Sequence, residues 1–142
     1  MLVAKYARTG IHPAPERLGL EVRELSPSTA VVLVSGEIDA SIETSLLEGI
    51  VATIGRHRQL VLDLSHLHFF GTAGYSALHR LNSHCARAGV DWVLISGPEV
   101  QRLMRLCDPD GIFPTASNIV SAVASLARGP HRTPLLRSVP TN

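Results

Sequence analysis

The hydrophobic residues of this chain first form two strand-like segments and then alternate between helical and strand spacing. Leu20, Val22 and Leu25 indicate a first strand, and residues 30–34 (AVVLV) are an aliphatic run typical of a strand buried on both faces. Residues 26–29 (SPST) between them have the chemistry of a turn. We therefore expect the two strands to pair antiparallel.

A helix and a third strand are predicted next. Residues 36–39 (GEID) are expected to break the second strand, with Asp39 or Ser41 capping a helix over residues 41–54. Residues 59–64 (QLVLDL) are another aliphatic run and indicate a strand near the middle of the sheet.

The pattern then repeats. A loop is expected at 65–68, and a second helix is predicted to begin near Thr72 and to end at Gly89. Residues 92–95 (WVLI) indicate a strand, and Gly97 with the proline after it opens a short helix.

The last elements are a short strand and a helix. We predict the strand at residues 112–113 and a helix capped by Ser117. The apolar positions of this last helix are Ile119, Val120, Val123, Leu126 and Ala127.

The predicted order of elements is ββαβαβαβα. Helical connections between aliphatic strands favour a mostly parallel sheet. We expect a single α/β domain over residues 19–128, with a four- to five-stranded sheet, an antiparallel N-terminal strand and about four helices. Residues 1–18 are interpreted as a tail or loop and residues 129–142 as a mobile tail. Partners of such sheets lie at the carboxyl ends of the strands, which here are residues 36–41, 65–72 and 96–98.

Composition and charge exclude several classes of function. The 142 residues include only three Phe, two Tyr and one Trp, so the core is expected to be aliphatic. The net charge is +1 and the basic residues are scattered, which argues against nucleic acid and membrane partners. No apolar run approaches the roughly 20 residues of a membrane span and no secretory signal is evident, so a cytoplasmic location is expected. Cys85 and Cys107 are expected to pack as small apolar side chains.

The common catalytic signatures are absent from the sequence. There is no nucleophile elbow, phosphate-binding loop, dinucleotide fingerprint or H-E-x-x-H metal motif. The seven histidines do not fall at the spacing of a closed metal-ligand set. We therefore expect no enzyme activity, no cofactor and no metal site.

Residues 61–74 (VLDLSHLHFFGTAG) carry the most informative pattern. A central strand leads to a pair of aromatic residues and then to Thr72 at the start of a helix. The free N–H groups and the dipole of a helix start favour negative charge, so a phosphate on Thr72 would be accommodated there. The alternative is that Thr72 is a plain N-cap, worth about 1 kcal/mol. Both interpretations stay open on this evidence.

These residues, together with 34–39 (VSGEID), resemble the STAS domain family, which comprises anti-sigma-factor antagonists and cytosolic domains of sulfate transporters. The family pattern has a strand ending in G-E-[IL]-D, a V-[IL]-D-[LF]-S strand, and an F-[ILM]-D-S-[ST]-G helix start. The resemblance implies binding to an anti-sigma factor that is also a serine/threonine switch-protein kinase, and hence release of a sigma factor. Phosphorylation of the helix-start hydroxyl by that kinase would block the binding.

Carried over by position, the resemblance makes Thr72 the phosphoacceptor, Asp39 the acidic position and Gly74 the helix-start glycine. This sequence departs from the pattern at Gly71, where the family has an acidic residue, and at Ala73, where it has Ser or Thr. The partner-binding residues expected around Thr72 are Asp39, Ser41, Phe69, Phe70, Gly71, Ala73, Gly74 and Tyr75.

Two other functions remain as alternatives. Gly71 and the two cysteines favour a STAS module that binds its partner without phosphorylation, or that responds to a ligand or to redox conditions. An enzyme with an unrecognised site at the strand ends is the third hypothesis, for which no base–nucleophile spacing can be identified.

Overall fold

The computed structural model describes residues 2–3 and 18–129 of the chain. Most of the two predicted tails therefore lies outside the described residues, and the predicted domain bounds stay a prediction. Two residues of the predicted N-terminal tail, however, form a short strand that pairs with the sheet.

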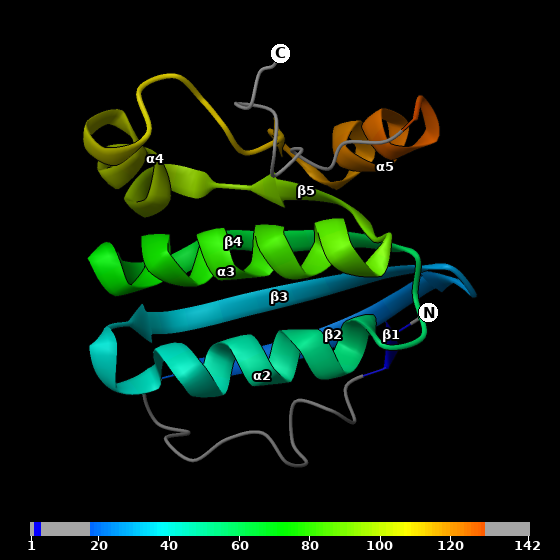
Figure 1. Cartoon of the computed structure of the whole chain (residues 1–142), viewed down its shortest axis with the longest axis horizontal. Coiled ribbons are helices and arrows are strands. Elements are labelled where there is room, and N and C mark those ends of the chain that lie inside the picture. The colour runs from blue at the N-terminus through cyan, green and yellow to red at the C-terminus, as the bar shows by residue number, and fades with distance from the viewer. Residues whose placement is uncertain (1, 4–17, 130–142) are drawn as a thin grey trace.

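Within the described residues, six strands form one sheet, flanked by five helical segments (Figure 1). The strands are β1 (Leu2–Val3), β2 (Leu18–Ser26), β3 (Thr29–Ile38), β4 (Gln59–Phe70), β5 (Asp91–Ile95) and β6 (Thr115–Ala116). The helical segments are the 3-10 turn η1 (Ala40–Ile42) and the α-helices α2 (Glu43–Ile54), α3 (Thr72–Ala88), α4 (Gly97–Cys107) and α5 (Ile119–Ala127).

The strands lie in sequence order, β1-β2-β3-β4-β5-β6. β1 and β2, and β2 and β3, pair antiparallel, whereas the pairs from β3 to β6 are parallel. The predicted fold class is confirmed. The sheet has six strands instead of four to five because β1 and β6 have two residues each, too few to produce a hydrophobic period.

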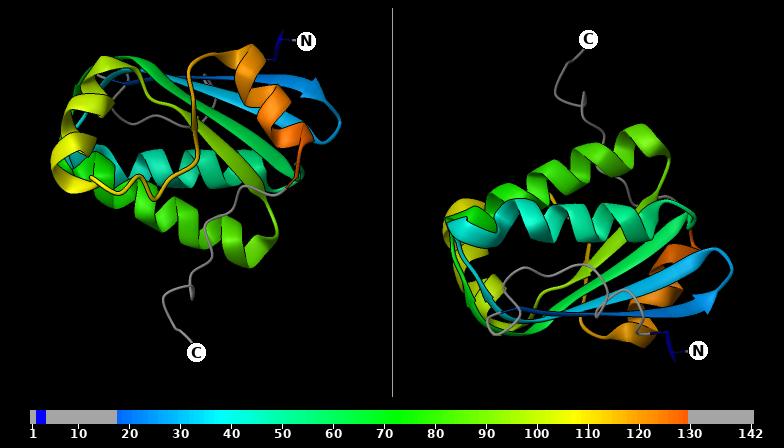
Figure 2. Two further views of the ribbon diagram at one scale, coloured as in Figure 1. Left: turned by 90° about the horizontal axis from the view of Figure 1, so that it is seen from above. Right: turned by 90° about the horizontal axis from the view of Figure 1, so that it is seen from below.

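Helices cover both faces of the sheet (Figure 2). α2 and α3 pack on one face, and the main core lies beneath them, centred on the inward residues Val32, Val34, Leu62, Leu64, Trp92 and Leu94. α5 covers part of the other face through a smaller cluster made of Val31, Val61, Val93, Ile95, Ala122 and Leu126. α4 lies at the end of the sheet to which the arrowhead of β3 points, where α2 and α3 begin (Figure 1).

The two central strands are longer than the sequence predicts. The predicted break at residues 36–39 and the predicted loop at 65–68 were wrong, because β3 continues to Ile38 and β4 to Phe70. The extensions pair with each other, and Leu67 is buried between two exposed histidines. This alternation is that of a strand with one face in the core, although the polar residues suggested a loop.

The predicted last strand at residues 112–113 was also wrong. Phe113 is a buried ring packed edge-on against Tyr75 and His79, with centroid distances of 5.9 and 5.0 Å. The last strand is instead β6, which pairs with Leu94 and Ile95. Phe113 therefore fills a space in the core before β6 begins. Its apolar ring is needed for packing against α3 and not for a strand.

The last helix differs from its prediction in cap and in face. Asn118, not Ser117, is the N-cap, since its side chain accepts the N–H of Ser121 at 2.8 Å. The buried residues are Ala122 and Leu126, whereas Val120, predicted on the apolar face, is 79% exposed and Val123 39%. The helix is apolar on several sides, so the hydrophobic period alone does not select the face that packs.

Two glycines with nearly the same positive φ occupy different surroundings. Gly89 ends α3 at φ 74° and Gly97 begins α4 at φ 75°. A Cβ on Gly89 would meet nothing within 4 Å, but one on Gly97 would lie 2.5 Å from the Cα of Ser65. α4 therefore approaches the backbone of β4 as closely as glycine permits.

Alanine at these two positions separates backbone strain from close approach. Both Gly89→Ala and Gly97→Ala carry the strain of a left-handed conformation, about 1–2 kcal/mol. We expect Gly97→Ala to lower the free energy of unfolding by about 2 kcal/mol more, because the Ser65 backbone must shift. Urea denaturation of both variants measures the difference, and equal losses would contradict the close approach.

Candidate functional site

Two helical segments begin side by side where β3 and β4 end. Ile38 pairs with Phe70 across the two parallel strands, so the residues that follow leave the sheet at the same level. Asp39 precedes η1 and Gly71 precedes α3, and the N–H of Gly71 lies 3.4 Å from the carbonyl oxygen of Ile38. The loops predicted at 36–41 and 65–72 therefore meet at one edge.

Asp39 caps the first of these segments. Its Oδ1 accepts hydrogen bonds from the N–H of Ser41 at 2.9 Å and from the Ser41 hydroxyl at 2.6 Å. The prediction that Asp39 is an N-cap is confirmed, although the first turn is 3-10 and α2 starts only at Glu43. Ser41 is exposed at this edge.

Thr72 is the first residue of α3, and its side chain is exposed. The plain-cap interpretation of Thr72 was wrong, because the N-cap is Gly71, which has no side chain to cap the helix. The first backbone bonds of the helix run from the N–H groups of Gly74 and Tyr75 to the carbonyl oxygen of Gly71. The N–H groups of Thr72 and Ala73 precede those bonds, so negative charge is favoured beside the Thr72 hydroxyl.

The two phenylalanines before this helix point in opposite directions. Phe70 is 5% exposed, whereas Phe69 is 48% exposed. A Cβ on Gly74 would overlap the Phe70 ring, so Gly74 lets α3 pack directly on Phe70. A Cβ on Gly71 would lie 3.0 Å from Cε2 of Phe69. The ring of Phe69 therefore lies beside the position at which the family pattern has an acidic side chain.

Tyr75 is turned toward α4. Its hydroxyl donates to the carbonyl oxygen of Cys107 at 2.9 Å, and its ring packs edge-on against His79 at 4.7 Å between centroids. Burial, followed by the charges of Asp108 and Cys107, raises the pKa of Tyr75 above its ordinary value of 10.0. The phenol thus stays a neutral donor at physiological pH and joins α3 to α4.

A polar bridge that the sequence analysis missed joins α2 and α3. Oε2 of Glu43 accepts from the Ser76 hydroxyl and from Nη1 of Arg80, both at 3.1 Å. Thr72, Ser76 and Arg80 follow one another at four-residue spacing along one side of α3. That spacing was the only signal in the sequence, because Glu43 lies 33 residues before Ser76.

Other candidate chemistry is limited in the part of the chain that the structure describes. Cys85 is fully buried as predicted, Cys107 is half-buried, and no disulfide joins them. Among residues 2–3 and 18–129, no three His, Cys, Asp or Glu side chains gather as metal ligands would. None of the described helices is long and apolar enough to cross a membrane.

Comparisons with known proteins agree with this architecture. The family model of the STAS domain matches residues 22–122. The chain is 35% identical over 114 residues to Osmosensory protein A of Mycobacterium tuberculosis, a match that covers 77% of this chain and 72% of that protein.

Solved structures of anti-sigma factor antagonists share the fold. The crystal structure of one from Mycobacterium paratuberculosis matches with a TM-score of 0.67 and 28% identity, over 82% of this chain and 99% of that one. The unphosphorylated anti-sigma factor antagonist SpoIIAA matches with a TM-score of 0.63 and 13% identity, over 78% of this chain and 97% of that one. The resemblance identified from residues 34–39 and 61–74 is thus confirmed, and the chain belongs to the STAS domain family.

Proposed function

We propose that this domain is an anti-sigma-factor antagonist that acts in the cytoplasm by stoichiometric binding and without catalysis. It binds an anti-sigma factor and so frees a sigma factor for transcription. Its family membership supports this proposal, as does its likeness to the anti-sigma factor antagonist of Mycobacterium paratuberculosis, at 28% identity.

We place the partner on the docking edge, defined as Asp39, Ser41, Phe69, Gly71 and Thr72. The observation that carries this assignment is the 48% exposed ring of Phe69 at the junction of β4 and α3, next to an exposed hydroxyl. Exposed aromatic side chains are preferred anchors of protein interfaces. Phe70, Ala73, Gly74 and Tyr75 support this edge from within or from the side facing α4.

Thr72 is proposed as the phosphoacceptor of a partner that is a serine/threonine switch-protein kinase. The kinase would transfer the terminal phosphoryl group of ATP to the Thr72 oxygen and release ADP, while its own base accepts the hydroxyl proton. The start of α3 favours the added charge of about −1.5 to −2, so the domain stays folded. The same charge in an interface beside Phe69 would lower the affinity, because its desolvation costs several kcal/mol.

The second candidate function is a STAS module that binds without phosphorylation and responds to a ligand or to redox conditions. Gly71 favours it, since no carboxylate stands before Thr72 to orient the hydroxyl for a kinase. The name of the relative Osmosensory protein A is also consistent with a sensor role.

Replacement of Phe69 tests the docking edge. Phe69→Ala is expected to weaken binding of the cognate anti-sigma factor at least about tenfold, because an aromatic anchor is lost. Leu25→Ala is the control, since Leu25 is 44% exposed and lies in β2 near the turn at the other end of the sheet. Isothermal titration calorimetry measures both variants. Similar affinities for the two variants would count against the docking edge.

A charge at Thr72 tests the switch. Thr72→Glu is expected to reduce anti-sigma factor binding at least about tenfold, and Ser28→Glu, at the distant β2–β3 turn, to leave it unchanged. Incubation of the wild-type chain with the kinase and ATP should add one phosphate at Thr72 by intact mass and peptide mapping. An unmodified chain, together with full binding by Thr72→Glu, would favour the phosphorylation-independent module.

A further inference from the structure

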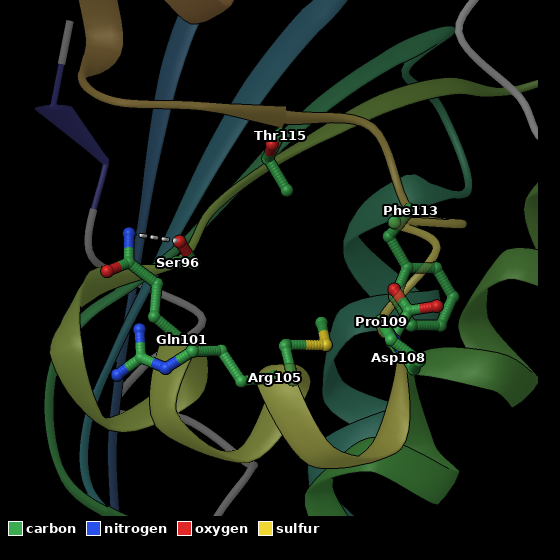
Figure 3. Close-up of a pocket in the computed structure, with 9 residues that line it drawn as sticks. Ser96, Gln101, Arg105, Asp108, Pro109, Phe113 and Thr115 are labelled. Carbon is green, nitrogen blue, oxygen red and sulfur yellow. Dashed lines mark hydrogen bonds between the residues drawn. The ribbon is translucent and has the colours of Figure 1, made fainter.

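A hollow lined by none of the docking-edge residues lies between α4 and the segment that leads into β6 (Figure 3). Its volume is about 340 Å³, near the lower end of the range for small-molecule sites. Ser96, the residue that follows β5, is part of its wall, so the hollow opens at the carboxyl end of a parallel strand. Ligands of parallel sheets are commonly bound at such ends.

Opposite charges flank the hollow. Arg105 extends toward Gln101 and Ser96 on one side, and Asp108 and Phe113 line the other (Figure 3). The two residues form no ion pair with each other, and no described residue gives the Arg105 side chain a hydrogen bond or ion pair. The hollow therefore presents a separated positive and negative group.

Asp108 has spare capacity to accept hydrogen bonds. The residue is 8% exposed, and among the described residues its two carboxylate oxygens share one donor, the N–H of Ile112, at 3.1 and 3.0 Å. An ionised carboxylate can accept about four hydrogen bonds. Its negative charge also reaches Tyr75, whose pKa it helps to raise. A buried carboxylate with one shared donor favours a cationic group beside it.

The two sides of the hollow differ in their surroundings. Met104 and Phe113 give it apolar walls near Asp108. Past Ser96 and Gln101 it continues into a polar hollow of about 420 Å³ lined by serine hydroxyls and Arg128. The negative end thus has apolar neighbours, whereas the positive end has polar ones.

We propose that this hollow binds a small zwitterion of amino-acid size, with its ammonium group on Asp108 and its carboxylate on Arg105. An α-amino acid carries both charges on one carbon atom, so the exposed Arg105 side chain would turn toward Asp108, which lies three residues further along the chain. Met104 and Phe113 would contact its apolar side chain. None of these four residues belongs to the docking edge.

The 142-residue chain is titrated with L-leucine, L-methionine and L-phenylalanine by calorimetry. Each amino acid is added up to about 10 mM, a range that detects a binding free energy of about −4 kcal/mol. At least one should bind saturably. For leucine, the matched one-charge analogues are 4-methylpentanoate, which lacks the ammonium group, and 3-methylbutylamine, which lacks the carboxylate. Each should bind at least about tenfold more weakly than leucine, because one charge pair is missing.

Two variants assign the charges. Asp108→Asn removes the negative charge but keeps a side-chain oxygen that can accept the N–H of Ile112. Arg105→Gln removes the positive charge at the exposed rim of the hollow. Each should weaken binding of the bound amino acid at least about tenfold. Arg102→Gln is the control, because Arg102 lies on α4 but pairs with Glu99 outside the hollow.

Three outcomes would overturn the proposal: no saturable binding of any of the three amino acids, equal binding of 4-methylpentanoate and leucine, or binding unchanged in both variants. Thermal unfolding without ligand checks that each variant is folded. If Asp108→Asn does not fold, the two one-charge analogues on the wild-type chain decide the outcome.

Discussion

The site depends on the parallel pairing of β3 and β4, which holds as far as Ile38 and Phe70. Because the two strands stop at paired positions, the chain leaves both at the same edge and starts η1 and α3 there. Asp39 and Thr72, 33 residues apart in sequence, thereby come to one surface. The bridge from Glu43 to Ser76 and Arg80 then ties the two helices together just below that edge. A shift of one residue in this register would turn every side chain of the edge to the other face.

The dipeptide Phe69-Phe70 connects the core to the docking edge. Phe70 is buried against Gly74, which fixes the distance between β4 and α3, and Phe69 on the opposite face is left exposed. The exposed ring is therefore held by a backbone that core packing makes rigid. A preorganised anchor loses little entropy on binding, which favours affinity in a small interface. Tyr75 holds the same helix from its other side through its bond to Cys107.

The aliphatic runs and the two family motifs were sufficient to predict the fold class, the alternation of strands and helices along the chain, and the position of Thr72 near a helix start. What they could not supply were features set by tertiary partners. Residues 65–68 have the composition of a loop but are held as a strand because β3 continues beside them. Phe113 has the hydrophobicity of a strand residue but fills a space between aromatic rings. Val120 faces solvent because the small Ala122, not the larger valine, meets the sheet.

Hydrogen–deuterium exchange of the chain, alone and with its anti-sigma factor, tests the central claim most directly. The account predicts that the partner adds protection at residues 38–43 and 69–76, the amides on either side of the paired strand ends. It predicts little change in α4 and α5, which contribute no residue to the docking edge. Protection confined to residues 97–127, with the paired strand ends unchanged, would contradict it.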